Sequence, residues 1–411
     1  MKRIILWMGV LALTMLLVAC GESAQTSTAA TGASTTPIVT TSASTTPAAV
    51  VTTAPTTLGV FDRYDLDSYM TPIWQGDTVY NESVMFVGKD DEASLLYTPS
   101  EIVSVRSSDL KTEYKAGVDY ELVGGKLVLC EGSSIPVMAY DEYYPKNGSD
   151  YGCFGSNLGA ERPFVRWGEG DTFTKYQVSV TYRHTDPYQG FMPKGQSECF
   201  PKTLAKLKNG EDVTIVFYGD SITEGYNTSK FVGVAPYAER FSEMSAAYLG
   251  KLYQNDKITC INTGVAGKDT AWGVQNLATS VLAHSPDLVV IAFGMNDGGL
   301  SPEALAQRML NMAKSAKNKG AEVLLVATML PNREAAGFFG NQHAFEEAML
   351  KAVEKSNQPF GVVQMTSLHA SMLEKKPYYH MTGNNINHPN DFLARLYAQS
   401  IVQAIAGDDY Q

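Results

Sequence analysis

The second half of the chain alternates short apolar runs with helix-forming stretches, and this alternation limits the folds it can adopt. Apolar runs of a length typical of buried strands cover residues 213–217, 258–261, 288–293, 323–327 and 362–365. Helical patterns cover residues 236–252, 270–283, 302–319, 344–356 and 391–406. Ser301 before Pro302 is a helix start, because the hydroxyl caps and proline suits the first helical position. We expect a doubly wound parallel sheet with helices on both faces.

The preceding part of the chain has the pattern of short strands and turns. Residues 118–123 and 126–129 flank Gly124-Gly125, which is the signature of a β-hairpin. Between residues 176 and 182 apolar and polar side chains alternate, as in a strand with one buried face. We predict an antiparallel β-sandwich domain without helices, followed by a connector and the α/β domain; these cover residues 58–185, 186–208 and 209–411.

The N-terminus has the features of a targeting segment. Basic Lys2 and Arg3 precede an apolar stretch that ends in Leu-Val-Ala-Cys20, which resembles the lipobox of bacterial lipoproteins. We predict a signal peptide over residues 1–20 with a lipid on Cys20, which anchors the protein to the outer face of the bacterial cell membrane; the alternative is an ordinary secretory signal. Residues 21–57 consist almost entirely of Ser, Thr, Ala, Pro, Val and Gly, so we predict a disordered stalk.

Charge and cysteine spacing exclude several classes of protein. The formal net charge of −11 argues against electrostatic binding of nucleic acid over a broad surface. The remaining cysteines are too widely spaced for a zinc site; they are Cys130, Cys153, Cys199 and Cys260. Four cysteines allow three disulfide connectivities, and Cys260 lies in an apolar run, so we expect a buried thiol there.

Ser221 is the first candidate for chemistry. It lies in Gly-Asp-Ser-Ile-Thr, directly after the first apolar run of the α/β part, where such folds place their reacting groups. A serine needs a base within hydrogen-bond reach. Of the six histidines, His388 is the best placed, because it lies in Asn-His-Pro-Asn just before the last long helix. The alternative for Ser221 alone is a helix N-cap.

Two further segments supply candidate donors for an oxyanion. Asn-Thr-Gly264 follows the second apolar run, and Gly-Met-Asn296-Asp follows the third. The backbone N–H groups of Ser221 and Gly264 and the side-chain amide of Asn296 would suit, and each such donor is worth roughly 10²–10³ in rate. Glycine at 264 would let the backbone approach the substrate without a Cβ clash. Taken singly, Gly264 and Asn296 are more often turn residues.

In this order, the four segments resemble the four blocks of the SGNH (GDSL) hydrolase superfamily. The resemblance covers about residues 213–407. It implies a flavodoxin-like three-layer fold, with Ser221 as nucleophile, His388 as general base, and Gly264 and Asn296 as oxyanion donors. It also implies no metal and no organic cofactor. The Gly-x-Ser-x-Gly elbow is absent, which argues against the α/β-hydrolase fold.

One position departs from the family pattern. The family usually has aspartate three residues before the histidine, where this chain has Asn385. An amide oxygen can accept the imidazole N–H but brings no charge, and in a triad that depends on its aspartate the change to asparagine costs about 10⁴-fold. We predict a Ser-His dyad or triad variant with Asn385 as the candidate orienter of His388. Asp391 is an alternative partner, but it starts a helix and is expected to be a structural cap.

Substrate contacts are predicted from weaker signals. Asp220, Trp272 and Tyr226 are candidates, with His380 behind them; Trp272 would wall an acyl pocket or fill the core. The aromatic residues between 140 and 167 would either bind sugar or pack the sandwich against the catalytic domain.

A β-sandwich ahead of an SGNH domain resembles the arrangement of family 2 carbohydrate esterases. We therefore predict a cell-surface esterase that deacetylates a polysaccharide or glycoconjugate and touches the membrane only through its lipid. The alternatives are a lipase or thioesterase for longer acyl chains, and an inactive surface protein that binds carbohydrate.

Overall fold

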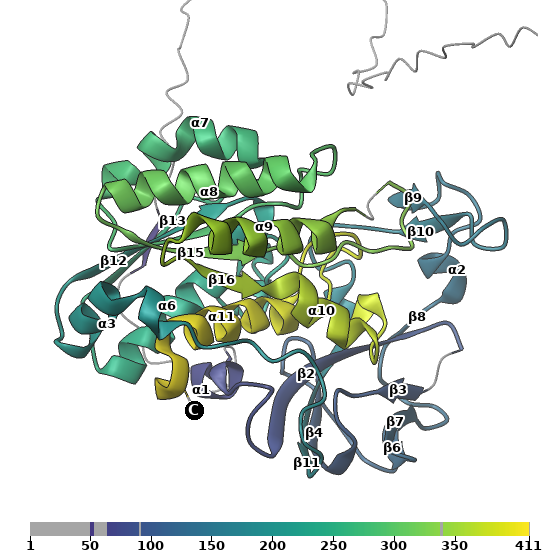
Figure 1. The fold of residues 1–411 in the computed structure, drawn as a ribbon. Coiled ribbons are helices and arrows are strands. Elements are labelled where there is room, and N and C mark those ends of the chain that lie inside the picture. Colours follow the sequence, from purple (N-terminus) through teal and green to yellow (C-terminus); the bar gives the residue numbers. More distant parts are fainter. Residues whose placement is uncertain (1–49, 53–63, 90–91, 338–339, 411) are drawn as a thin grey trace, which may run out of the picture. The chain divides into compact units, whose positions relative to one another are not determined.

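A computed structural model describes residues 50–52, 64–89, 92–337 and 340–410 (Figure 1). The described residues belong to one compact unit. The predicted signal peptide, the predicted lipidation site Cys20 and the predicted stalk, apart from residues 50–52, lie outside them. Within these ranges, no helix combines the length and the apolar character that crossing a membrane requires.

The α/β part is built on a sheet with strand order β1-β13-β12-β14-β15-β16. Five of these strands run parallel: β12 (Val213–Gly219), β13 (Ile258–Asn262), β14 (Leu288–Ala292), β15 (Glu322–Ala327) and β16 (Gly361–Gln364). Numbered along the chain, the parallel strands have the order 2-1-3-4-5 of flavodoxin-like folds. The prediction of a parallel sheet from five apolar runs is confirmed.

The edge strand β1 (Val50–Thr52) pairs antiparallel with β13. The sequence predicts a disordered stalk through residue 57, so the structure differs from the prediction at these three residues. Three consecutive β-branched residues favour an extended backbone. The edge of β13 offers unpaired N–H and C=O groups to such a segment.

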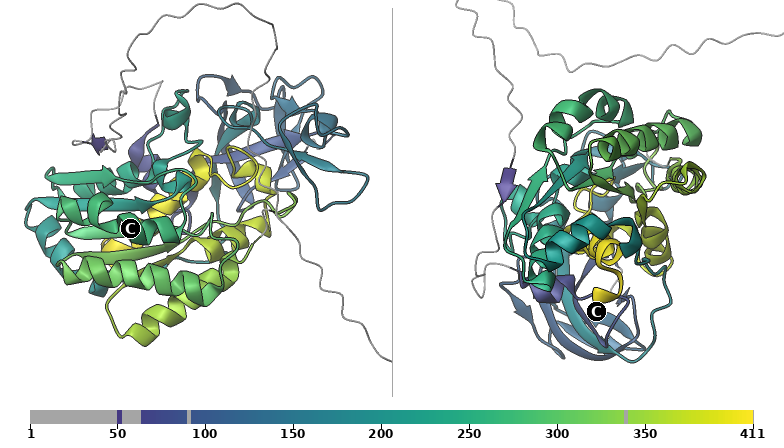
Figure 2. Two further views of the ribbon diagram at one scale, coloured as in Figure 1. Left: turned by 90° about the horizontal axis from the view of Figure 1, so that it is seen from above. Right: turned by 60° about the vertical axis from the view of Figure 1, so that its left-hand side comes forward.

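Helices cover both faces of the sheet (Figure 1; Figure 2, right). One face packs against α7 (Thr270–Ser280), α8 (Pro302–Asn318) and α9 (Gln342–Ser356). The other packs against α3 (Pro201–Lys208), α6 (Phe241–Tyr253), α10 (Met365–Leu373) and α11 (Asp391–Ala406). Val216 and Tyr218 of β12 point into the first layer, and Ile215 and Phe217 into the second. A strand buried on both faces is therefore apolar throughout, which explains the continuous runs in the sequence.

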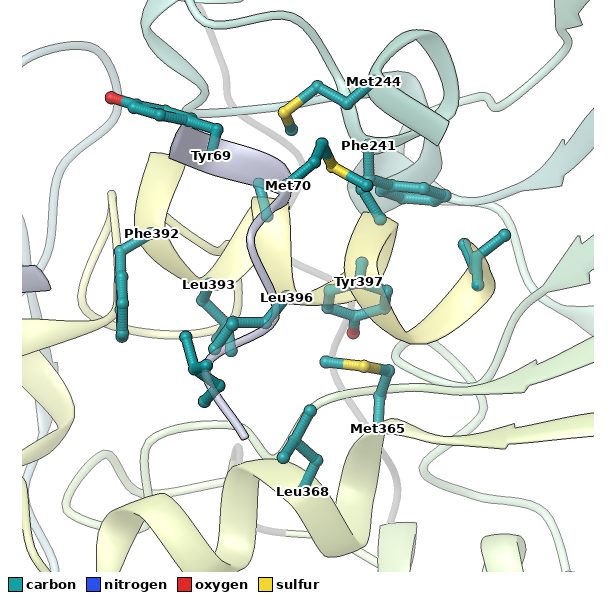
Figure 3. Close-up of a cluster of buried hydrophobic side chains, with 14 of the residues drawn as sticks. Tyr69, Met70, Phe241, Met244, Met365, Leu368, Phe392, Leu393, Leu396 and Tyr397 are labelled. Atoms are coloured by element: carbon teal, nitrogen blue, oxygen red, sulfur yellow. The ribbon is translucent and has the colours of Figure 1, made fainter. Parts of the chain in front are cut away.

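Helix α11 is the centre of the second layer. Every residue after Asp391 in this helix is buried, as expected of a helix surrounded by protein. Figure 3 shows its side chains among residues of α6, α10 and the short helix α1 (Leu66–Met70). Asn390 caps α11, because its Oδ1 accepts the Leu393 N–H at 3.1 Å. A deeply buried helix thus fixes the position of His388, two residues before the cap.

The part of the chain before α3 is rich in strands. One sheet has the order β5-β4-β11-β2-β8 and is made of β2 (Thr78–Val87), β4 (Pro99–Ser107), β5 (Glu113–Tyr114), β8 (Val137–Met138) and β11 (Gln177–His184). A second has the order β3-β7-β6 and is made of β3 (Glu92–Ser94), β6 (Tyr120–Val123) and β7 (Lys126–Leu129). A further pair joins β9 (Cys153–Gly155) and β10 (Phe164–Arg166). We call residues 64–185 the β-rich part.

The β-rich part differs from the prediction in two ways. The pair β2–β8 is parallel, whereas the prediction was purely antiparallel. Short helices occur where none was expected, namely α1 and α2 (Tyr140–Tyr143), and α3 lies within the predicted connector. Single turns of 3₁₀ helix complete the fold at Thr174–Tyr176, Ser197–Cys199, Leu282–His284, Tyr378–His380 and Gly407–Asp409.

The predicted hairpin is present as β6 and β7, with Val123 paired to Lys126. Gly124 and Gly125 have φ values of 58° and 80°. A two-residue hairpin turn that needs positive φ at both positions favours glycine at both. The hairpin prediction is confirmed.

Strand β11 is buried on its apolar face and partly buried on the other, where Gln177 and Thr181 are covered and Arg183 is exposed. Val178 and Val180 are fully buried, as predicted, but Gln177 on the other face is only 3% exposed. Its Nε2 donates to the carbonyl oxygens of Tyr379 at 3.0 Å and Thr382 at 2.8 Å. Polar side chains are buried here because they hydrogen-bond the segment that leads to His388. The β-rich part therefore helps to hold that segment in place.

Candidate active site

Ser221 is the first residue of the short helix α4 (Ser221–Glu224), which follows β12 directly. Its N–H is one of the first-turn donors that have no acceptor within a helix. Asp220 caps this turn, because its Oδ1 accepts the Ile222 N–H at 3.0 Å. Burial raises the pKa of Asp220 to about 7, and the residue is only 1% exposed. This corrects the prediction that Asp220 contacts substrate: it shapes the turn that presents Ser221.

His388 lies against Ser221, with Nε2 2.9 Å from Oγ. The two residues are nearly covered, at 6% and 4% exposed. The structure thus brings together the two residues that the sequence singled out first, from segments that follow the first and the last of the five parallel strands along the chain. For His388 to take the serine proton at Nε2, the ring must carry its own proton on Nδ1.

Three polar groups surround Nδ1 of His388. Asn227 Oδ1 lies at 2.8 Å, Asn384 Nδ2 at 2.9 Å and Glu169 Oε2 at 3.4 Å. None of the three was predicted from the sequence. Asn384 had a signal in the asparagine-rich run beside the histidine, whereas nothing local connects Glu169, in the β-rich part, to His388.

Asn385 does not orient His388, and this prediction is corrected. Its Oδ1 accepts from Tyr143 Oη at 3.1 Å and from Asn332 Nδ2 at 3.3 Å, and its Nδ2 donates to the Arg166 carbonyl at 3.0 Å. Asn385 has φ 66°, a left-handed conformation that asparagine tolerates. Its side chain therefore ties the histidine loop to the β-rich part, and Asn227 supplies the amide oxygen next to Nδ1.

Gly264 follows β13 and packs against the turn that carries Ser221. A Cβ at this position would lie 2.5 Å from Glu224 N and 2.8 Å from Thr223 C, so a side chain cannot fit. Its N–H donates to Asn262 Oδ1 at 2.9 Å. Close packing on α4 is thus a reason for glycine at this position that was not predicted from the sequence.

Asn296 lies beyond the end of β14, and β14 pairs with β12 through Ala292 and Gly219. It is exposed, and its Nδ2 donates one N–H to the Lys268 carbonyl at 3.0 Å. A side-chain amide has two N–H groups. The second N–H of Asn296 and the N–H of Ser221 remain candidate oxyanion donors, whereas the Gly264 N–H donates to Asn262.

Three weaker candidates for substrate contact have different surroundings. The Tyr226 ring lies 5.3 Å from the imidazole of His388. Trp272 belongs to α7 and is half-buried, with its ring 5.8 Å from that of Tyr218 at the edge of the first helix layer, so its choice between acyl pocket and core filler stays a prediction. His380 is 2% exposed, and its Nε2 lies 2.9 Å from the Met85 carbonyl.

Asp391, the other alternative, accepts the Ser229 N–H at 2.8 Å and has its pKa raised to about 6 by burial. It thus makes a structural contact at the start of α11.

The described residues contain neither a candidate metal site nor a disulfide bond. In those ranges, no group of three or more His, Cys, Asp or Glu side chains could hold a metal ion. Cys130, Cys153 and Cys199 carry free thiols, and Cys260 is buried with its Sγ 3.5 Å from the Ser242 carbonyl.

The comparison with protein families agrees with this geometry. Residues 217–396 match the GDSL-like Lipase/Acylhydrolase family, a span that includes Ser221, Gly264, Asn296 and His388. The chain therefore contains a GDSL/SGNH hydrolase domain, and the match supports a carboxylic-ester hydrolase.

Curated relatives match a shorter stretch. Esterase TesA of Pseudomonas aeruginosa is 31% identical over 121 residues, which is 29% of this chain and 55% of that protein. An arylesterase of Vibrio mimicus is 28% identical over 119 residues, 28% of this chain and 55% of that protein. The chain spans about half the length of the curated relatives it matches.

Solved structures of esterases are also similar to part of the chain. A two-domain esterase active on acetylated mannans is 22% identical with a TM-score of 0.41, and the alignment covers 51% of this chain and 53% of that one. An acetylxylan esterase from Geobacillus stearothermophilus is 15% identical with a TM-score of 0.40, covering 48% of this chain and 95% of that one.

Proposed function

We propose that this protein is a serine esterase in which Ser221 is the nucleophile and His388 the general base. The observation that carries the proposal is the 2.9 Å contact between Oγ and Nε2, within the span that matches the hydrolase family. Ser221 Oγ bonds to the acyl carbon while its proton passes to Nε2, and the carbonyl electrons move to oxygen. The N–H of Ser221 and the second N–H of Asn296 stabilise that oxyanion.

The reaction then continues in two stages, formation of an acyl-enzyme and its hydrolysis. Its collapse expels the alcohol, whose oxygen takes the proton from Nε2, and leaves an acyl group on Ser221. A water molecule next attacks the acyl carbon as its proton passes to Nε2. The second collapse breaks the bond to Oγ, returns the proton to the serine, and releases the carboxylic acid.

The proposed substrate is an acetyl ester on a polysaccharide or glycoconjugate. Ser221 and His388 are only 4% and 6% exposed, which favours a small acyl group over a long chain. The aromatic residues between 140 and 167 differ in exposure. Tyr143 is buried against the loop that carries His388, whereas Tyr151 is 43% exposed with Arg166 over its ring. Exposed aromatic rings with a polar neighbour suit sugar contacts.

Chain-length preference tests the substrate proposal. We expect p-nitrophenyl acetate to be hydrolysed with a kcat/KM about tenfold or more above that for the octanoate, because the covered site limits acyl size. Acetate release from acetylated xylan and mannan oligosaccharides would follow. A preference for octanoate would support the lipase or thioesterase alternative. Rates equal to those of Ser221→Ala on every ester would leave the carbohydrate-binding alternative.

We also propose that Cys20 carries a lipid that anchors the protein outside the bacterial cytoplasm. The support is the sequence Leu-Val-Ala-Cys20 after an apolar stretch, outside the described residues. When the full chain is expressed in bacteria fed labelled palmitate, we expect labelled protein in the membrane fraction. Cys20→Ala should be unlabelled and lost from the membranes. An unlabelled wild type, or equal retention of the variant, would contradict the anchor.

A further inference from the structure

The groups around Nδ1 of His388 decide which ring nitrogen carries the proton. Asn227 Oδ1, at 2.8 Å, can only accept, and Asn384 Nδ2, at 2.9 Å, can only donate. With the proton on Nδ1, Nε2 is open to the proton of Ser221. With the proton on Nε2, the ring donates to Ser221 Oγ and cannot serve as its base. The neutral amides therefore support two competing tautomers, of which one is productive.

The orientation of each amide follows from its other contacts. Asn384 Oδ1 accepts the backbone N–H groups of Ile386, Asn387 and His388, each at 3.0 Å. Asn227 Nδ2 faces two carbonyl oxygens, those of residues 170 and 383, at 3.3 and 3.5 Å. Turning either amide over would set like groups against one another. Asn384 thus presents a donor to Nδ1, and Asn227 an acceptor.

Glu169 resolves this competition. Its Oε1 accepts from Asn384 Nδ2 at 3.1 Å, and the other N–H of that amide goes to Asn387 Oδ1 at 3.0 Å. Asn384 thus has two N–H groups for three acceptors, the third being Nδ1 at 2.9 Å. When both N–H groups go to the oxygens of Glu169 and Asn387, Nδ1 is free to carry its own proton. Glu169 Oε2, 3.4 Å from Nδ1, also places a negative charge where it favours a proton on that nitrogen.

We propose that Glu169 is a positioning residue that holds His388 in the tautomer able to activate Ser221 and that stabilises the imidazolium formed during turnover. This inference rests on the proposed esterase function. Glu169 supplies the charge that Asn385 lacks, and it does so from the segment after β10, in the β-rich part. The β-rich part is then a component of the active site, and the α/β domain alone has an incomplete one.

The charge on Glu169 is maintained by its neighbours. Partial burial opposes ionisation, but the hydrogen bonds and charge of His388 and the amides of Asn384 and Asn227 outweigh it, so the pKa of Glu169 lies below its ordinary value. The side chain is 42% exposed, so solvent screens the interaction. We therefore expect less than the roughly 10⁴-fold loss of a buried triad acid.

Other titratable groups near His388 make different contacts. The ring of Tyr226 is tilted relative to the imidazole of His388, and the two ring centroids are 5.3 Å apart. Glu224 Oε2 accepts the Ala266 N–H at 2.6 Å, and Asp391 accepts the Ser229 N–H. Among the described ion pairs, Glu169 is the carboxylate that faces His388.

Glu169→Gln tests the proposal, because it removes the charge and keeps the shape. Its matched control is Asp171→Asn, which removes an exposed carboxylate two residues along the same segment. For p-nitrophenyl acetate we expect Glu169→Gln to lower kcat by about 10- to 100-fold with little change in KM. The acid limb of its pH–rate profile should move to lower pH, since the imidazolium loses its partner. Glu169→Asp should retain part of the rate, and Asp171→Asn should resemble wild type.

A second readout needs no substrate. NMR of isotope-labelled histidine reports the tautomer of His388, with its signals assigned by their loss in His388→Ala. We expect the Nδ1–H tautomer in wild type and Asp171→Asn, and a larger Nε2–H fraction in Glu169→Gln and, to a smaller extent, Glu169→Asp. A tautomer shift without any ester hydrolysis would support the positioning role while the proposed function fails. If folded Glu169→Gln has the same tautomer of His388 and the same pH profile as wild type, the positioning role of Glu169 is overturned.

Discussion

Replacing either Ser221 or His388 by alanine is expected to lower kcat/KM for p-nitrophenyl acetate by about 10⁴-fold or more, with no further loss in the double variant. The two side chains act through one contact, at 2.9 Å between Oγ and Nε2. Without the imidazole, the hydroxyl keeps its proton, and without the hydroxyl, the imidazole has no nucleophile to activate. The measurement is steady-state hydrolysis by purified single and double variants.

Matched controls for these variants lie on the surface of the same domain. Ser315 on α8 and His343 on α9 are exposed, so Ser315→Ala and His343→Ala should keep wild-type rates. Losses that add up in the double variant would mean that the two residues act separately. Substantial hydrolysis by Ser221→Ala, after removal of contaminating esterases, would place the nucleophile elsewhere.

The sheet could be predicted because parallel strands covered on both faces leave continuous apolar runs. The run at residues 213–217 became β12, and helices fill the space on both its faces. Strand β11 had the opposite outcome. Its alternating sequence predicted one solvent-exposed face. Gln177 on that face is buried instead, because its side chain donates hydrogen bonds to the segment before His388. A polar residue buried by a distant partner has the same sequence signal as an exposed one.

The candidate site could be predicted where position along a strand or helix determines it. Ser221 directly follows a strand and His388 lies just before a helix, and the structure brings them together. The surroundings of Nδ1 were missed because Asn227, Asn384 and Glu169 come from three separate segments. Asn385 was expected from family spacing, but its left-handed backbone directs the side chain towards Tyr143.

Replacing Lys376 by methionine is expected to lower the free energy of unfolding by about 3–5 kcal/mol. Lys376 Nζ pairs with Glu82, and the side chains of both residues are 0% exposed. Burial lowers the pKa of Lys376, and the charge of Glu82 opposes that shift. Glu82 also accepts the Leu96 N–H and the Tyr182 hydroxyl. Removing the ammonium would leave a buried carboxylate without a cation, and urea denaturation at neutral pH would measure the loss.

The double variant Glu82→Gln/Lys376→Met separates the buried charge from the packing. It should recover much of the lost stability, because glutamine still accepts from Leu96 and no unpaired charge remains. The exposed pair of Arg106 and Glu113, at 42% and 60% exposed, provides the control: Arg106→Met should change stability by less than about 1 kcal/mol. Equal losses of stability in Lys376→Met and Arg106→Met would contradict the idea that Lys376 and Glu82 form a pair shielded from water.

This buried pair also bears on how the protein unfolds. Glu82 lies on β2, and Lys376 follows α10, so the pair joins the β-rich part to the α/β part. The apolar cores of the two parts are continuous as well. Because an unpaired charge at this joint weakens both parts together, circular dichroism and tryptophan fluorescence should report one shared transition in wild type and in Lys376→Met. Two separated transitions would show that the parts unfold independently, and that the pair does not couple them.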